Sequence, residues 1–115
     1  VVFDWEVIGK SEARTYGIET GVLCAAANAF CEIIEDAGYG EYFGHGYGHS
    51  LGIEIHESPN ANTREETLLP VGAVVSAEPG IYLPGKFGVR IEDVTVLTAD
   101  GCMVLTKSPK ELIIL

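Results

Sequence analysis

The chain has 115 residues, of which 47% are hydrophobic, and this is enough to build the core of one domain. Seventeen acidic and seven basic side chains give a net charge of −10, and such a surface repels phosphate backbones, so we expect no nucleic-acid partner. No apolar run approaches the length that crosses a bilayer, so we expect no membrane partner either.

The first part of the chain predicts one short strand and one main helix. Residues 1–5 open with three apolar side chains and are typical of a strand, and because the chain starts there without a methionine we expect it to be part of a longer protein. Apolar residues then recur with a helical period from Val22 to Ala37, with Thr20 as the candidate N-cap. Gly38 stands just beyond the last turn, where a left-handed residue is favoured.

The second part predicts short antiparallel strands. Residues 58–70 are polar and predict a loop. Beyond this loop the pattern predicts strands at 73–77, 81–83, 89–98 and 103–105, with turns at 84–85 and 99–101. In the longest of them the apolar residues change from odd to even positions near Glu92, which predicts a bulge or a change of exposure, unless the strand simply starts at an exposed edge. One helix followed by antiparallel strands predicts an α+β domain.

The three histidines all lie within twelve residues, in a segment rich in glycine. His45 and His49 have the spacing of one strand face, whereas His49 and His56 lie on opposite faces unless the chain bends or bulges near Gly52. A lone histidine in such a context is more often structural, but three together favour a functional site. Imidazole acts there as a neutral metal ligand or as a proton donor.

Two glutamates extend this candidate site. Glu78 follows a run of apolar strand residues, where a carboxylate is costly unless it is paired or bound to metal. Glu92 comes two residues after Arg90 on the same strand face. The two form either a surface ion pair of little energetic value or a metal ligand with its supporting arginine. Imidazole and carboxylate donors of this kind bind Mn, Co, Zn or Fe.

The cysteines complete the composition argument. Cys24, Cys31 and Cys102 are odd in number and show no CxxC spacing, so a disulfide framework is not expected. This pattern fits the reducing cytoplasm. The spacing of Cys24 and Cys31 puts them on one face of the predicted helix, as small core residues.

Four ordered motifs carry a resemblance to a known family: EYFGHGYGH at 41–49, HESP at 56–59, EPGIY at 78–82 and GVRIED at 88–93. Together with LTKSPKEL at 105–112, they closely resemble the C-terminal half of the catalytic domain of the pita-bread metallopeptidases. This family includes methionine aminopeptidases, Xaa-Pro dipeptidases and aminopeptidase P, and the motifs resemble the proline-peptidase branch. The resemblance implies a pita-bread α+β fold shortened to roughly that half, with one main helix packed on a curved antiparallel sheet. Residues 1–115 would then form a single truncated catalytic domain.

The resemblance also implies a site for two divalent metal ions, held by two aspartates, one histidine and two glutamates. His49 matches the ligand histidine, Glu78 matches one ligand glutamate, and Glu92 matches the glutamate that bridges both ions. Asp4 is the candidate for the first aspartate. Manganese or cobalt is the expected metal, with zinc or iron as alternatives, and the number of ions in this chain is two, one or none.

The implied activity is that of an exopeptidase, which hydrolyses a peptide bond with a metal-activated water. The expected substrate is a peptide with proline at its second position. His45 and His56 match histidines that line the substrate site and stabilise the tetrahedral intermediate, and Arg90 matches an arginine that supports the ligands. Glu78 is also positioned to pass a proton to the leaving nitrogen.

The front of the chain departs from the family pattern. The second ligand aspartate is expected at position 15, where this chain has a threonine, and the nearest carboxylate is Glu12. The segment between Trp5 and Gly21 also looks much shorter than in the family. Either Glu12 replaces the aspartate or one metal site is incomplete, and we favour incompleteness. The alternative function is therefore a non-catalytic fragment or binding module of the same fold.

The missing half also predicts a quaternary structure. Half of a pita-bread domain leaves a sheet edge and an apolar face uncovered. We therefore expect a homodimer in which two chains pair through the same surface.

Overall fold

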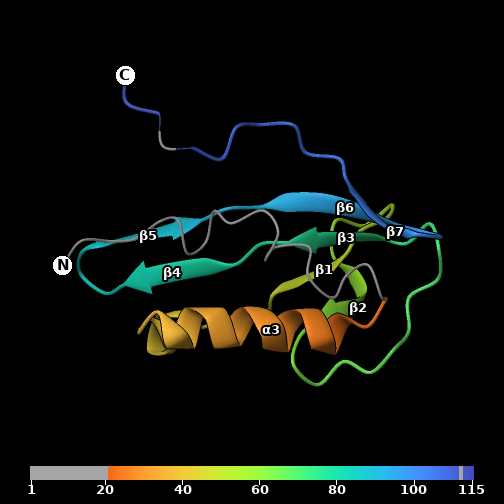
Figure 1. Cartoon of the computed structure of the whole chain (residues 1–115), viewed down its shortest axis with the longest axis horizontal. Helices are drawn as coiled ribbons and strands as arrows, with labels where there is room; N and C mark the ends of the chain where they lie inside the picture. Colours follow the sequence, from red (N-terminus) through yellow and green to blue (C-terminus); the bar gives the residue numbers. More distant parts are fainter. Residues whose placement is uncertain (1–20, 112) are drawn as a thin grey trace.

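A computed structural model describes residues 21–111 and 113–115 of the chain. This part contains one α-helix, one 3-10 turn and seven strands: α3 (Leu23–Asp36), η2 (Gly40–Tyr42), β1 (Gly48–Ser50), β2 (Glu57–Ala61), β3 (Val74–Ala77), β4 (Gly80–Leu83), β5 (Phe87–Arg90), β6 (Asp93–Thr98) and β7 (Gly101–Val104). The strands form a five-stranded sheet in the order β2-β1-β3-β6-β7 and a two-stranded ribbon of β4 and β5. In Figure 1 the ribbon continues the line of β3 and β6, and α3 lies along one side of both. Within the described residues no helix is long and apolar enough to cross a membrane.

The helix α3 confirms the predicted helical segment, although its buried face is rotated slightly from the face that the apolar period predicts, which is Val22, Ala26, Ala29 or Phe30, Ile33 and Ala37. The buried side chains have spacings of three and four residues, and they are Leu23, Ala26, Ala27, Phe30 and Ile34. Ile33 is half-buried and Ala37 is exposed. Gly38 has a φ of +82°, so the predicted left-handed residue follows the helix. The predicted cap Thr20 and the predicted strand at 1–5 lie outside the described residues.

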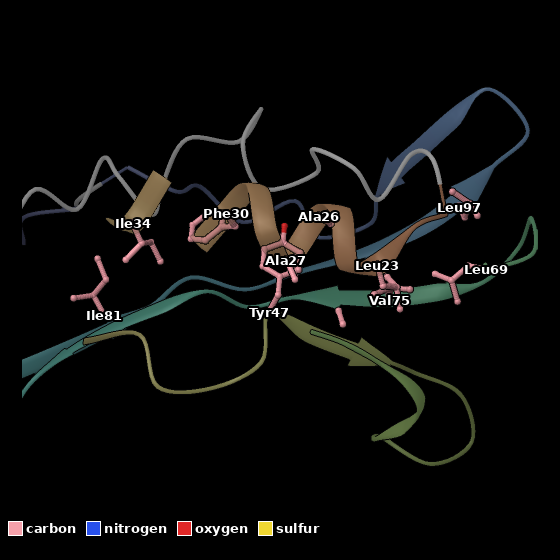
Figure 2. Packing of buried hydrophobic residues seen from close by; sticks show 12 residues of the cluster. Leu23, Ala26, Ala27, Phe30, Ile34, Tyr47, Leu69, Val75, Ile81 and Leu97 are labelled. Atoms are coloured by element: carbon pink, nitrogen blue, oxygen red, sulfur yellow. The ribbon is translucent and has the colours of Figure 1, made fainter. Parts of the chain in front are cut away.

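The core lies between α3 and the strands (Figure 2). The rings of Phe30 and Tyr47 have their centroids 5.5 Å apart, and Ile34 points toward Ile81 at one end of the layer. Full burial of an aromatic or branched side chain stabilises a fold by about 1.5–3 kcal/mol. Because α3 covers the face that carries Val75 and Ala77, the alternate side chains of β3 point to the other face.

The ribbon β4–β5 and the strand pair β3–β6 share one unbroken register. Ala77 pairs with Asp93 and Gly80 with Arg90, and no residue is added on either arm between these pairs. Glu78 and Glu92 therefore occupy opposed positions on the two arms. The predicted bulge near Glu92 is wrong.

The change of phase in the sequence has a different cause, which is burial of polar residues. Asp93 and Thr95 are 3% and 0% exposed, so the odd-numbered core face continues through polar residues. Thr95 satisfies its hydroxyl by donating to the Val75 carbonyl at 3.0 Å. Asp93 forms an ion pair with Lys110 at 2.7 Å. Each buried polar group therefore has a partner, which makes its burial tolerable.

The predicted loop at 58–70 is partly wrong, because its first residues belong to β2. This edge strand pairs antiparallel with β1, and His49 lies opposite Asn60. Polar residues and a proline are acceptable there because an edge strand has one unpaired side. The register shifts between His49 and Ser50, and the chain then turns back through 51–56 toward β2. The three cysteines are free, and all are only partly buried.

Candidate metal and substrate site

A cavity of about 580 Å³ brings together most of the predicted site residues. It is lined by His45, Gly46, Gly48, His49, His56, Asn60, Asn62, Glu78 and Arg90. Five of these nine are predicted catalytic or metal-binding residues. Glu92 is exposed and does not line the cavity, although it lies opposite Glu78 in the register. Asp4 and Glu12 lie outside the described residues.

His49 and Glu78 form a direct pair at the buried side of the cavity. Nε2 of His49 lies 2.9 Å from Oε1 of Glu78, and His49 is only 8% exposed. Nδ1 of the same ring lies 3.0 Å from the Ser50 carbonyl oxygen, which can only accept a hydrogen bond. The ring proton of a neutral His49 therefore sits on Nδ1, and Nε2 presents a lone pair to the carboxylate.

Two acceptor atoms that face each other at this distance need a positive species between or beside them. A proton meets this need, and so does a metal ion. The donor set fits a divalent metal. A histidine that binds metal through one ring nitrogen usually donates a hydrogen bond from the other nitrogen to a carbonyl or carboxylate, as His49 does to Ser50. Among residues 21–111 and 113–115, no three His, Cys, Asp or Glu side chains converge into a complete metal cluster. The described residues thus bring together His49 and Glu78 but do not add Glu92 to that pair.

Ser76 joins the two members of this pair, and the sequence reasoning missed it. Its Oγ accepts the backbone N–H of His49 at 2.9 Å and donates to Oε1 of Glu78 at 2.9 Å. The Glu78 backbone N–H in turn donates to the Tyr47 carbonyl at 2.8 Å. The available signal was the strand period, because Ser76 and Glu78 are two residues apart and share a face of β3 and its continuation.

His45 is held by a second hydrogen-bond network. Nδ1 of His45 lies 2.7 Å from the Gly46 carbonyl, and Nε2 of His45 lies 2.8 Å from the hydroxyl of Tyr82, a further residue that the sequence reasoning missed. Because the carbonyl can only accept, Nδ1 carries the proton and the tyrosine hydroxyl donates to Nε2 of the neutral ring. The available signal was the glycine two residues before the tyrosine. A Cβ atom at Gly80 would lie only 2.5 Å from the Tyr82 hydroxyl, so the glycine makes room for that side chain.

Arg90 supplies the positive charge beside the cavity. Its Nε lies 3.7 Å from Oε2 of Glu78. The hydrogen bond and the electrostatic interaction with Tyr82, followed by the charge of Glu78 and more weakly that of Glu92, raise the pKa of Arg90 above its usual value. The guanidinium thus stays charged and links Glu78 to the network around His45.

His56 reaches the cavity because the chain bends. The rings of His49 and His56 have their centroids 4.3 Å apart, and His56 is exposed. The register shift after His49 and the reversal through 51–56 bring the two rings together, which is the bent alternative of the sequence prediction. An exposed imidazole beside a buried one is placed to contact a bound molecule rather than the core.

Comparisons with known proteins place the chain in one family. The model of metallopeptidase family M24 matches residues 11–99. The chain is 47% identical over 116 residues to the uncharacterized peptidase YqhT of Bacillus subtilis, a match that covers 100% of this chain and 31% of that protein. It is 50% identical over 82 residues to the Xaa-Pro dipeptidase of Pyrococcus furiosus, covering 71% of this chain and 24% of that protein.

The YqhT match also bears on the front of the chain. Because it covers the whole chain in 116 aligned positions, it leaves no room for the large deletion expected between Trp5 and Gly21. The expected deletion is therefore wrong when the chain is compared with YqhT.

Solved structures give the same result for the fold. A dipeptidase from Pyrococcus horikoshii superimposes with a TM-score of 0.90 at 41% identity, covering 96% of this chain and 32% of that chain. An Xaa-Pro dipeptidase from Bacillus anthracis superimposes with a TM-score of 0.88 at 47% identity, with the same coverage. The chain thus spans about a third or less of these proteins, and its helix on an antiparallel sheet is the predicted piece of the pita-bread fold. The chain belongs to metallopeptidase family M24.

Proposed function

We propose that this chain carries part of the catalytic site of a metal-dependent exopeptidase that cleaves peptides with proline at the second position. The observation that carries the proposal is the His49–Glu78 pair, in which two acceptor atoms lie 2.9 Å apart at a cavity. Relatives named Xaa-Pro dipeptidase support the substrate class. The chain spans only part of those proteins, so the activity of the whole protein is part of the proposal.

His49, Glu78 and Glu92 are the proposed metal ligands, with manganese or cobalt as the metal. Glu78 and Glu92 occupy opposed positions in the two links that join β3 and β6 to the ribbon, and this supports a shared site for the two carboxylates. A bound divalent metal lowers the pKa of a coordinated water and polarises a peptide carbonyl. Asp4 is the proposed fourth ligand, and unchanged metal affinity in an Asp4→Asn variant would remove it from the set.

The side chains around the pair have separate proposed roles. Oε1 of Glu78 is engaged by Ser76 and His49 at 2.9 Å, whereas Oε2 has only the longer 3.7 Å contact with Arg90, so Oε2 is the atom proposed to take a proton and pass it to the leaving nitrogen. His56 is exposed beside His49 and can donate to the carbonyl oxygen of a bound peptide as negative charge develops there.

His45 and Arg90 serve to hold the substrate side of the cavity. The neutral ring of His45 presents an apolar face because both of its nitrogens are already hydrogen-bonded. Arg90 stays charged next to Glu78 and limits repulsion between the two glutamates.

The proposal extends to assembly and location. Within the described residues β2 and β7 form the two edges of the five-stranded sheet, and such edges can pair with a second chain, which supports a homodimer. Light scattering at micromolar concentration tests it, and a monodisperse monomer would contradict it. Three free thiols fit a cytoplasmic protein.

Calorimetric titration with Mn²⁺ and Co²⁺ tests the metal site directly. The wild-type chain is expected to bind metal, and Glu78→Gln to bind it at least 10-fold more weakly because a ligand charge is lost. Glu32→Gln is the matched control, since it removes the same charge from an exposed position on α3. Absence of binding in the wild type would refute the proposal.

The same titration and a hydrolysis assay separate enzyme from binding module. Two ions per chain, together with turnover of Xaa-Pro dipeptides or of longer peptides with proline second, is the result expected of an enzyme. One ion without turnover is the result expected of an incomplete site. The assay is run on the metal-loaded chain, with metal removal by chelator as the blank.

A further inference from the structure

We infer that Ser76 is a positioning residue, which uses its single hydroxyl to fix His49 and Glu78 relative to each other. The inference rests on the proposed function, in which these two residues bind metal. Ser76 is neither a predicted site residue nor part of the cavity wall. It acts from behind the pair, through two hydrogen bonds of 2.9 Å.

The direction of both hydrogen bonds is fixed by chemistry. The backbone N–H of His49 can only donate, so it occupies a lone pair of the Ser76 oxygen. The one hydroxyl proton is then free for a single acceptor, and that acceptor is Oε1 of Glu78. Ser76 is 0% exposed, so the described surroundings leave the hydroxyl without access to solvent. The serine therefore has one low-energy orientation, in which it connects the two residues.

The close approach of β1 and β3 is what allows this connection. Gly48 precedes His49, and a Cβ atom at Gly48 would lie 2.0 Å from the Ser76 carbonyl oxygen. A side chain there would push the strands apart and lengthen the hydrogen bond to the His49 N–H. The glycine before the histidine and the serine before the glutamate thus belong to one arrangement, although 27 residues separate His49 from Ser76.

The consequence is a pre-set distance between the two proposed ligands. A Glu side chain has several rotatable bonds, and ordering it on metal binding costs free energy. A hydroxyl that already holds Oε1 next to Nε2 of His49 reduces that cost before the metal arrives. Hydrogen bonds that orient metal ligands typically change metal affinity about 10- to 100-fold. Ser76 is expected to have an effect in this range.

Three variants of the full 115-residue chain test the inference. Ser76→Ala removes the hydroxyl. Ser76→Thr retains it. Thr95→Val is the matched control, because Thr95 is also 0% exposed and donates its hydroxyl to a strand carbonyl, but it touches neither His49 nor Glu78. Each variant is titrated with Mn²⁺ and with Co²⁺, its Co²⁺ absorption spectrum is recorded, and its unfolding midpoint in urea is measured.

The expected result separates positioning from simple structural support. Ser76→Ala loses the two buried hydrogen bonds of its hydroxyl and Thr95→Val loses one, so both should lower the urea midpoint. Only Ser76→Ala should weaken metal binding by about 10-fold or more and shift the Co²⁺ bands. Ser76→Thr should bind more tightly than Ser76→Ala. Equal affinity and an unchanged spectrum in Ser76→Ala would overturn this inference alone. Failure of the wild type to bind either metal would overturn the proposed function and this inference with it.

Discussion

The substitution Gly48→Ala is the most direct test of how closely β1 and β3 must approach. The added Cβ atom would lie 2.0 Å from the Ser76 carbonyl oxygen and 2.7 Å from its carbonyl carbon. Both atoms belong to the backbone of a buried strand, so no side-chain rotation relieves the overlap. To reach an ordinary contact of about 3.4 Å, the strands must separate locally by more than 1 Å.

The magnitude follows from two terms. Inserting a methyl group into a filled interior costs about 1–3 kcal/mol. The separation also breaks the hydrogen bond from the His49 N–H to Ser76, now 2.9 Å, and this loss adds about 1 kcal/mol. Gly48→Ala should therefore lower the free energy of unfolding by about 2–4 kcal/mol. Because the same hydrogen bond helps to hold the His49–Glu78 pair, metal affinity should fall as well.

Urea unfolding followed by circular dichroism measures the first effect, and calorimetry with Mn²⁺ measures the second. Gly44→Ala is the matched control, since a Cβ atom at Gly44 meets nothing within 4 Å and its backbone is not left-handed. The control should unfold within about 0.5 kcal/mol of the wild type or slightly later. If Gly48→Ala and Gly44→Ala unfold at the same urea concentration, the close approach of β1 and β3 at Gly48 does not contribute to the free energy of unfolding, and the reasoning is refuted.

Two further predictions concern groups away from the cavity. Lys110→Met should lower the free energy of unfolding by about 1–3 kcal/mol, because it removes the cation that lies 2.7 Å from the buried carboxylate of Asp93. Adding Asp93→Asn should bring the urea midpoint back toward that of the wild type, and no recovery would argue against the pairing. Partial burial, and then the charge of Glu35, raises the pKa of Cys31. Its alkylation by iodoacetamide, followed by peptide mass spectrometry, should thus need a higher pH than that of a free thiol. Glu35→Gln should move this pH profile downward, and an unmoved profile would exclude the charge effect.

Local features of the fold were predictable from the sequence. Gly38 after α3 and the turn before β7 depend on neighbouring residues only, and both are where the pattern placed them. The strands at β3 and β4 were also predicted, because apolar runs bounded by Pro and Gly leave few alternatives. The fold class followed from the order of these elements and from the resemblance carried by the motifs.

Features that depend on distant partners were less accessible. Thr95 has a polar side chain in a core position, and only its hydrogen bond to Val75 makes that position acceptable. Because such core positions hold polar residues, the apolar pattern of the sequence changes phase there, and this change led to the incorrect prediction of a bulge. The site shows the same division: the histidines and Glu78 stood out by type, whereas Ser76 acts through contacts that pairing of β1 with β3 creates.

The unbroken register from β3 and β6 into β4 and β5 has a consequence for how the length of this chain can vary. Glu78 and Glu92 keep opposed positions only while both arms between the sheet and the ribbon keep equal length. A residue inserted in one arm flips the side chains beyond it to the other face, unless a bulge absorbs it or the other arm gains one too. Residues added at the tip, within 84–86, leave the pairing untouched. Insertions and deletions among homologues should accordingly collect at this tip and be rare, or occur in matched pairs, along the arms.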